Sequence, residues 1–216
     1  MKAMILAAGY GRRMLPLTEK LPKPLLQVSG KALIEHHLEK LAHAGFQDVV
    51  VNHGHLGPMI EDALGDGARF GLSIRYSPEG PEPLETGGGM AKALPLLGHE
   101  PFLIVNADIF CDYDFSEVPE LDPHADAHLV LVDTPGYKPR GDFSLRGGDV
   151  VEEPEPTLTY SGIAVYHPSI LDGAKVERFS IVPRLREAIA GGRVRGSHHR
   201  GQWSDVGTPE RLLQLQ

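Results

Sequence analysis

Short apolar runs alternate with amphipathic segments along the first half of the chain. Three runs are expected to form buried strands because they are rich in aliphatic and β-branched residues. These runs are Lys2–Leu6, Asp48–Asn52 and Leu72–Tyr76. Between them, apolar residues recur at helical spacing over Lys31–Ala44, with Gly45 as the C-cap, and over Leu56–Leu64. This β-α-β-α-β alternation predicts an α/β fold whose parallel sheet carries helices on both faces.

The second half of the chain continues the alternation less regularly. Further strands are predicted at Phe102–Val105, Ala127–Val132 and Thr159–Tyr166, and a hairpin at Asp142–Leu145 and Asp149–Glu152 around Gly147 and Gly148. Helices are predicted at Thr86–Leu97 and at Ser180–Ala190, with Ser180 as the cap. A last helix begins with Thr208 as N-cap and Pro209 in its first turn.

Composition narrows the class of protein. A chain of 216 residues suits one domain with a core of its own. The net charge of -8 argues against a nucleic-acid partner. The single cysteine, Cys111, rules out an internal disulfide and suits a reducing compartment such as the cytoplasm. No apolar stretch approaches the ~20 residues of a membrane span, so no membrane association is expected.

The turn after the first strand carries the strongest chemical signal. Gly9 and Gly11 let backbone N–H groups converge on an anion, and Arg12 and Arg13 add charge-assisted contacts to phosphate oxygens. Lys23 lies between two prolines in a segment expected to be stiff and extended, and it supplies another cation. The spacing fits neither the dinucleotide fingerprint nor the P-loop. The segment therefore predicts a polyphosphate cradle at the carboxyl end of a β-strand.

A second glycine cluster opens the predicted helix at Thr86. Three glycines, Gly87–Gly89, would leave bare backbone N–H groups and room for a flat ring, although a flexible surface loop is the plain alternative. Beside the cradle, a site for the nucleobase and ribose is the better interpretation.

Two aspartates are candidates for a divalent cation. Asp108 follows the strand Phe102–Val105, and Asp205 precedes the helix that starts at Thr208. Mg²⁺ prefers one or two carboxylates with phosphate oxygens and waters. A loop aspartate or an N-cap is the alternative for each, but at two strand ends the pair suits one metal site. The histidine pairs His36–His37 and His198–His199, by contrast, lack zinc-site spacing and are interpreted as surface or core residues.

The region from about Thr134 to Tyr166 is interpreted as the lobe that binds a second substrate. Gly141 begins an irregular stretch that would let a ligand approach the backbone. Gly162 removes a side chain in the middle of a predicted strand, which often marks close ligand approach.

Five segments occur in order across nearly the whole chain: L-A-A-G-Tyr10-G-Arg12-R-M, P-Lys23-P, Glu85-T-G-G-G, N-A-Asp108 and W-S-Asp205-V-G-T-P. Together they resemble the signature of the sugar-1-phosphate nucleotidyltransferases. The resemblance implies the nucleotide-diphospho-sugar transferase fold, a Rossmann-like three-layer α/β/α sandwich with a mixed, mainly parallel central sheet and a small acceptor-sugar lobe. It also implies one domain over residues 1–216, with the nucleotide half at 1–110 and the acceptor half at 111–216, acting as a monomer.

The resemblance also implies roles for individual residues. Arg13 and Lys23 are the expected catalytic residues, and Asp108 and Asp205 the expected ligands of Mg²⁺. The expected nucleotide-binding residues are Leu6, Ala7, Ala8, Gly9, Gly11, Arg12, Arg13, Glu85, Thr86, Gly87 and Asn106. The expected sugar-phosphate-binding residues are Lys23, Asp108, Gly141, Glu153, Tyr160 and Ser161, with Glu152 as the alternative to Glu153.

The implied reaction joins a nucleoside triphosphate, with UTP favoured, to a sugar 1-phosphate and releases pyrophosphate. The short chain and the segments E-T-G-G-G, G-D-F and T-Y-S-G-I favour N-acetylmuramate 1-phosphate as acceptor, in peptidoglycan recycling. Glucose-, mannose- or N-acetylglucosamine 1-phosphate and phosphocholine stay open as acceptors, as does a non-catalytic nucleotide-sensing module. Two residues depart from the family pattern, since Arg12 replaces a usual Thr and Tyr160 a frequent Asn.

Overall fold

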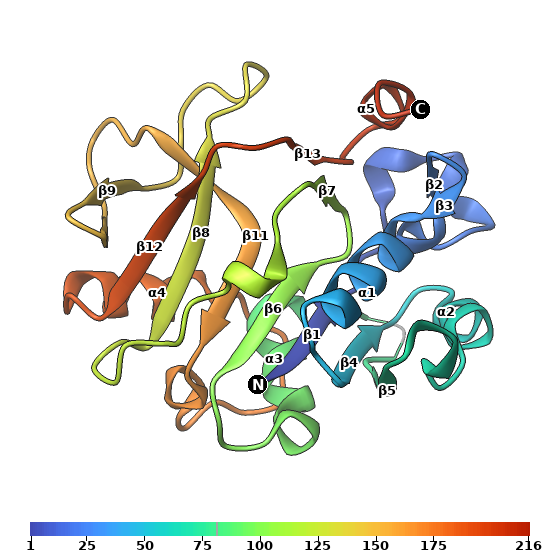
Figure 1. The fold of residues 1–216 in the computed structure, drawn as a ribbon, viewed down its shortest axis with the longest axis horizontal. Coiled ribbons are helices and arrows are strands. Elements are labelled where there is room, and N and C mark those ends of the chain that lie inside the picture. The colour runs from blue at the N-terminus through green and yellow to red at the C-terminus, as the bar shows by residue number, and fades with distance from the viewer. Residues whose placement is uncertain (81) are drawn as a thin grey trace.

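The computed structural model describes residues 1–80 and 82–216. These residues form a central nine-stranded sheet, whose strand order is β5-β4-β1-β6-β11-β8-β12-β10-β9 (Figure 1). Its strands are β1 (Lys2–Leu6), β4 (Asp48–His53), β5 (Ser73–Pro78), β6 (Phe102–Asn106), β8 (Ala127–Asp133), β9 (Ser144–Arg146), β10 (Asp149–Val151), β11 (Leu158–Tyr166) and β12 (Val194–His199). Strands β5, β4, β1 and β6 run parallel, β11 is antiparallel to both of its neighbours, and β8 pairs parallel with β12.

The side chains of the sheet alternate between two cores. On β1, Ala3 and Ile5 pack in the core that includes α1 (Leu33–His43) and α2 (Gly57–Leu64). Met4 between them packs with α3 (Glu85–Leu97) and α4 (Val182–Ala190). Successive side chains of a strand point to opposite faces, so both faces are covered, and Figure 1 shows α1 in front of the sheet and α3 behind it. The predicted three-layer α/β/α sandwich with a mixed, mostly parallel sheet is confirmed.

Smaller elements surround the carboxyl ends of β1 and β6. They are the antiparallel pairs β2 (Gln27–Val28) with β3 (Lys31–Ala32) and β7 (Ile109–Cys111) with β13 (Trp203–Asp205), and the helix α5 (Pro209–Leu213). Short 3-10 turns occur at Arg12–Met14, Leu17–Glu19, Lys23–Leu25, Ala68–Phe70, Phe115–Glu117 and Pro168–Leu171. Leu212 of α5 packs in one small core with Met14, so the C-terminal helix is tied to the turn after β1.

Most predicted elements are present, with shifted ends. Helix α1 starts at Leu33 and not at Lys31, because Lys31 and Ala32 pair with β2. Helix α4 starts at Val182, whose amide donates to the Ser180 hydroxyl over 3.2 Å, so Ser180 stands one position before the cap. Among the described residues, no helix has the length and apolar character needed to cross a membrane.

Candidate active site

The chain turns sharply after β1, and Gly11 makes this turn possible. Gly11 has a φ of +63°, which residues with a side chain rarely adopt. A Cβ there would also lie 2.9 Å from Thr18 Cγ2 and 3.2 Å from Lys23 Cβ. The Thr18 hydroxyl donates to the Gly11 carbonyl over 2.9 Å. Gly11 therefore brings the Lys23 segment against the turn, whereas the position of a Cβ on Gly9 is open space.

A cavity of about 310 Å³ opens beside this turn. Three cations line it: Arg12 and Arg13 are exposed, and Lys23 is buried. The Arg12 guanidinium lies over the Tyr10 ring, 5.1 Å from its centroid. Other predicted nucleotide-binding residues in the walls are Leu6, Ala7, Gly9, Gly11, Thr86 and Asn106. Clustered cations beside small residues are the arrangement that suits a polyphosphate.

Lys23 forms an ion pair at the floor of this cavity. It begins a 3-10 turn, so the predicted extended conformation is wrong except for Pro22, which has a ψ of 142°. Lys23 Nζ lies 2.5 Å from Asp108 Oδ2, and the side chains are 10% and 35% exposed. Asp108 follows β6, the strand that pairs with β1. The parallel pairing of these strands therefore puts Asp108 beside the turn after β1, where Gly11 lets the Lys23 segment pack.

Asp205 lies next to Asp108 in space although it comes from the end of the chain. Strand β13 pairs with β7 so that Asp205 is opposite Ile109, and the Val206 amide donates to the Asp108 carbonyl over 2.8 Å. Asp205 Oδ1 accepts from Arg211 Nη1 over 2.6 Å. Both aspartates line a cavity of about 440 Å³.

Tyr137 makes a second hydrogen bond to Asp205. Its hydroxyl donates to Asp205 Oδ1, and its ring lies 3.5 Å from the Arg211 guanidinium carbon. Burial, together with this bond and the charge of Asp205, raises the pKa of Tyr137 to about 12. The phenol is therefore protonated near pH 7 and remains a donor.

The donor set at the two aspartates fits Mg²⁺. This ion takes one or two carboxylates and completes its shell with phosphate oxygens and water. Each carboxylate has one oxygen engaged, Asp108 Oδ2 with Lys23 and Asp205 Oδ1 with Arg211 and Tyr137. Among residues 1–80 and 82–216 there is no group of three or more His, Cys, Asp or Glu side chains that could hold a metal. A metal here would therefore draw its other ligands from substrate and water.

The first turn of α3 is packed against the chain. The prediction of bare N–H groups there is wrong for Gly87 and Gly88, which both donate to the Phe179 carbonyl, over 3.0 and 3.1 Å. A Cβ on Gly87 would lie 2.3 Å from the Phe179 ring, and one on Gly88 would lie 2.0 Å from the Glu177 carbonyl oxygen. These glycines allow close packing of residues 177–179, and Gly87 does not take part in the walls of the cavities described here.

Glu85 and Thr86 do reach the cleft. They line a cavity of about 490 Å³ that also includes Ala8. Glu85 has a φ of +60°, and its carboxylate lies 2.9 Å from Arg178 Nε. The Thr86 hydroxyl accepts from the Ile181 amide over 3.1 Å. The start of α3 is thus fixed on both sides beside this cavity.

A buried polar network beside the same cavity was not predicted. Asn52 is 2% exposed, accepts from the Ala7 amide over 2.8 Å and donates to Glu79 Oε1 over 2.6 Å. Glu79 Oε2 accepts from the Leu84 amide over 2.7 Å. The network ties the turn after β1 to the start of α3. An asparagine at the end of an apolar strand was the available signal, whereas Glu79 lies in a loop rich in other acids.

A cavity of about 510 Å³ extends from the cleft towards α4 and β11. It brings together the predicted residues Gly141, Glu153 and Tyr160. A Cβ on Gly141 would lie 2.5 Å from the Leu158 carbonyl oxygen, so this glycine allows contact with β11. Burial raises the pKa of Tyr160 well above its usual value, and its hydroxyl is hydrogen-bonded to Tyr166. Tyr160 is therefore a neutral side chain in the wall.

The glutamates at this cavity are paired with arginines, and one further arginine is not paired with a glutamate. Arg186 Nε lies 2.9 Å from Glu152, and Arg146 lies 2.5 Å from Glu153, so both candidate glutamates are paired. Arg140 is exposed in the same wall and forms no ion pair with any residue that the structure describes. The cavity therefore has a cation available for an anionic group.

Ser161 lines the cavity of about 440 Å³, but its hydroxyl is bonded within the sheet. Its hydroxyl donates to the Val130 carbonyl over 2.7 Å and accepts from the Ile163 amide over 3.1 Å, across a register shift in β11. Since a hydroxyl has one proton, it has none left to donate to a ligand. Gly162, with a φ of +86°, leaves room for Asn106, whose Nδ2 would lie 2.9 Å from a Cβ there. Gly162 also lines the cavity of about 440 Å³, so close ligand approach there stays a prediction.

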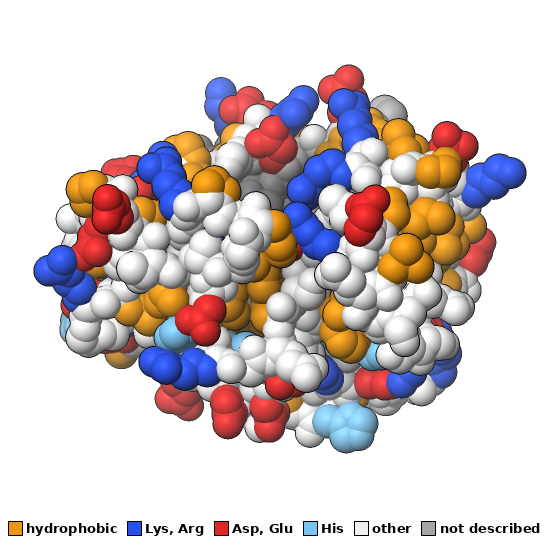
Figure 2. Space-filling view, turned by 90° about the horizontal axis from the view of Figure 1, so that it is seen from above, with side chains coloured by type: hydrophobic (Ala, Val, Ile, Leu, Met, Phe, Trp, Pro, Cys, Tyr) orange, Lys and Arg blue, Asp and Glu red, His pale blue; other side chains and the backbone are white. Residues whose placement is uncertain are grey.

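The four cavities share walls and form one cleft at the carboxyl ends of β1 and β6. Thr86 lines three of them, Asn106 lines three, and Arg13 and Asp108 line two. Ligands of open α/β sheets bind at this edge. Figure 2, which looks down from above the view of Figure 1, shows Lys and Arg side chains around a hollow, with Asp and Glu side chains among them. The arrangement can hold anionic ligands with their charged ends at Arg13 and Lys23.

Comparisons with known proteins agree with this geometry. A family model described as nucleotidyl transferase matches residues 2–144. The chain is 50% identical to N-acetylmuramate alpha-1-phosphate uridylyltransferase of Neisseria meningitidis, over 100% of this chain and 97% of the relative. It is 36% identical to the protein of the same name from Caulobacter vibrioides, over 98% and 93%. A crystal structure from Bacillus anthracis, described as a glucose-1-phosphate thymidylyltransferase, aligns with a TM-score of 0.84 at 21% identity, over 100% and 93%.

Proposed function

The chain belongs to the nucleotidyl transferase family, and we propose that it makes a nucleotide-sugar from UTP and N-acetylmuramate 1-phosphate with release of pyrophosphate. The observation that carries this proposal is the 50% identity to a named uridylyltransferase over the whole chain. The cleft supports it, because cations and a pair of carboxylates meet where two anionic substrates would have to approach each other. The reaction would place the protein in the recycling of peptidoglycan.

The proposed chemistry is one in-line displacement. A phosphate oxygen of the sugar 1-phosphate attacks the α-phosphorus of UTP, the new P–O bond forms, and the bond to pyrophosphate breaks. The nucleophile is already an anion, so no strong general base is needed. Arg13 and the turn from Gly9 to Gly11 hold the β- and γ-phosphates, and Lys23 offsets charge at the α-phosphate. Catalysis then rests on position and preorganised charge.

Asp108 and Asp205 are the proposed ligands of Mg²⁺ in this reaction. When bound, the ion would neutralise charge on the reacting phosphates. The carboxylates hold the ion, while Lys23 and Arg211 keep each of them oriented through one oxygen. Their pairing also reduces the repulsion that two acidic residues would otherwise exert on anionic substrates.

The acceptor would occupy the cavity that contains Tyr160 and Arg140. N-Acetylmuramate differs from N-acetylglucosamine by a lactyl ether that ends in a carboxylate. A guanidinium recognises a carboxylate through paired N–H donors. Arg140 is the arginine of this wall without an ion pair among the described residues, so it is the proposed contact for that group.

The test is release of pyrophosphate by the purified protein with Mg²⁺. Four nucleoside triphosphates would be crossed with sugar 1-phosphates that include the N-acetylmuramate, N-acetylglucosamine, glucose and mannose compounds. A dominant signal for UTP with N-acetylmuramate 1-phosphate is expected. Preference for another pair would reject the substrates and keep the reaction. Nucleotide binding without turnover on any acceptor would reject the enzymatic proposal in favour of a nucleotide-sensing role.

A further inference from the structure

His37 is a buried polar side chain without a place in the proposed reaction. It is 2% exposed, and its Nε2 lies 2.9 Å from the Ile109 carbonyl oxygen. A carbonyl only accepts, so Nε2 carries the proton and Nδ1 is bare. Among the described residues, this Nδ1 is the only buried side-chain nitrogen or oxygen without a hydrogen-bond partner. A buried unpaired nitrogen is costly, so the bond to Ile109 is what the imidazole adds over an apolar side chain.

The same helix contacts the rest of strand β7. The His36 ring packs edge-on against Phe110, with ring centroids 5.1 Å apart and an interplanar angle of 88°. Lys40 Nζ donates to the Cys111 carbonyl. Helix α1 therefore touches all three residues of β7, and two of these contacts are hydrogen bonds to its backbone carbonyls.

Strand β7 connects the two carboxylates of the cleft. Asp108 directly precedes Ile109, and Asp205 lies opposite Ile109 in β13. The Val206 amide also donates to the Asp108 carbonyl over 2.8 Å. A shift of Ile109 would therefore move both aspartates. Asp108 would move because it is the adjacent residue of the chain, and Asp205 because it pairs with Ile109.

We propose that His37 is a positioning residue, which sets the separation of Asp108 and Asp205 by holding the Ile109 carbonyl. The inference rests on the proposed function, because that function assigns the two aspartates to a divalent cation. Groups that orient metal ligands typically change metal affinity or activity by about 10- to 100-fold when removed. His37 acts through the backbone, one step further away, so the lower end of this range, about tenfold, is expected.

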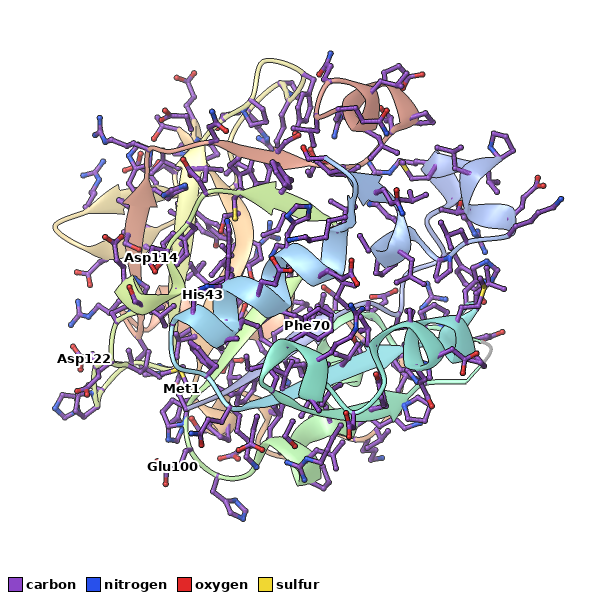
Figure 3. All side chains as sticks on the ribbon, turned by 45° about the vertical axis from the view of Figure 1, so that its right-hand side comes forward. Met1, His43, Phe70, Glu100, Asp114 and Asp122 are labelled. Carbon is purple, nitrogen blue, oxygen red and sulfur yellow. The ribbon has the colours of Figure 1, made fainter. Side chains whose placement is uncertain are left out.

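The test compares three variants at this helix. His37→Leu removes the donor and keeps similar bulk, while His37→Gln puts an amide N–H near the position of Nε2. His43→Leu is the matched control, since His43 is an exposed histidine of the same helix (Figure 3), and the one hydrogen bond of its side chain among the described residues is to the Glu39 carbonyl in that helix. Mn²⁺ binding with and without UTP would be followed by electron paramagnetic resonance, and Mg²⁺ half-saturation by pyrophosphate release.

His37→Leu is expected to weaken Mn²⁺ binding about tenfold and to raise the Mg²⁺ half-saturation in parallel. His37→Gln should restore both values to within about threefold of the wild type, and His43→Leu should leave them unchanged. Should His37→Leu fail to fold, Lys40→Met loosens the same strand at Cys111 and should shift Mn²⁺ binding in the same direction.

Two results overturn the inference alone. One is wild-type Mn²⁺ binding in the folded variants that lack the His37 or Lys40 donor. The other is a His37→Gln variant as weak as His37→Leu, because the donor would then not be what matters. A wild-type protein that binds no Mn²⁺ with or without UTP overturns the metal assignment of the proposed function and the inference with it.

Discussion

Replacing Lys23 by Met would remove the positive charge at the floor of the cleft and keep most of the side-chain volume. Met keeps most of the buried aliphatic stem and removes the ammonium group that lies 2.5 Å from Asp108 Oδ2. The Asp108 side chain is 35% exposed, so water can solvate it when the partner is gone. The loss of stability should therefore be about 1 kcal/mol, nearer to that of exposed ion pairs than of buried ones. For a chain of this length that is about 2–4 °C in Tm.

Turnover should fall far more than stability. A preorganised donor aimed at developing charge is worth about 3 kcal/mol, so kcat should drop about 10²- to 10³-fold. The positive charge of the ammonium group, which lies on Asp108 Oδ2, also repels a divalent cation bound to the other oxygen of this carboxylate. Its removal should therefore lower the Mg²⁺ concentration that gives half-maximal rate. The reasoning thus requires opposite changes, a lower kcat and tighter Mg²⁺ binding.

The assay is pyrophosphate release from UTP and N-acetylmuramate 1-phosphate over a Mg²⁺ series, with thermal melting alongside. Lys23→Arg is the control, because it keeps the charge but spreads it over a larger planar group, and its kcat should be intermediate. A kcat of Lys23→Met within about threefold of wild type would refute the catalytic role. A rise in the Mg²⁺ half-saturation would refute the repulsion between Lys23 and the metal.

Three further predictions concern packing, substrate choice and pH. Gly88→Ala should lower the free energy of unfolding by about 2–3 kcal/mol, because its Cβ would lie 2.0 Å from the Glu177 carbonyl oxygen. If this variant unfolded in urea like the wild type, the packing argument would be contradicted. Arg140→Gln should reduce kcat/KM about tenfold for N-acetylmuramate 1-phosphate and leave N-acetylglucosamine 1-phosphate unaffected, so an equal loss on both acceptors would reject the carboxylate contact. Burial, with smaller contributions from Lys40 and His36, lowers the pKa of His37 from 6.5 to about 4, so between these values the unfolded chain binds a proton that the folded chain does not. Stability should then fall as the pH drops from 6.5 towards 4, by at most about 3 kcal/mol from this residue, and His37→Leu should flatten that part of a pH series of chemical denaturation.

The sequence predicted the helices and strands in which apolar residues recur at a regular spacing. Lys2–Leu6 is confirmed to the residue, and Thr208 caps α5 by accepting from the Arg211 amide as its sequence indicates. Strands β7 and β12 were missed for a physical reason. Strand β7 has three residues, too few for a period, and β12 is the half-polar segment V-R-G-S-H-H that forms a strand because β8 offers it a parallel edge.

Topology explains which site residues were predictable. Asp108 had to lie beside the turn after β1 because parallel neighbours end at the same edge, and the packing at Gly11 adds Lys23 to this place. The contacts of Gly87 and Ser161 could not be predicted from the sequence, because each depends on what packs against the residue. Phe179 occupies the space beside Gly87, and the Val130 carbonyl takes the Ser161 proton. Such partners lie far away in sequence, and no local pattern encodes them.

The ion pairs of the cleft offset the negative charge of its two aspartates. Two aspartates beside the proposed binding site for phosphates would repel the substrates unless their charge were offset. Lys23 pairs with Asp108, and Arg211 with Asp205, each through one carboxylate oxygen. The Arg211 guanidinium in turn stacks on Tyr137, which donates to the same oxygen of Asp205. Each acid is thus neutralised and oriented before any ligand arrives and retains a second oxygen for a cation. Because Arg211 belongs to α5, whose Leu212 packs with Met14 beside the first turn, the C-terminal helix contributes to a site that begins at the N-terminus.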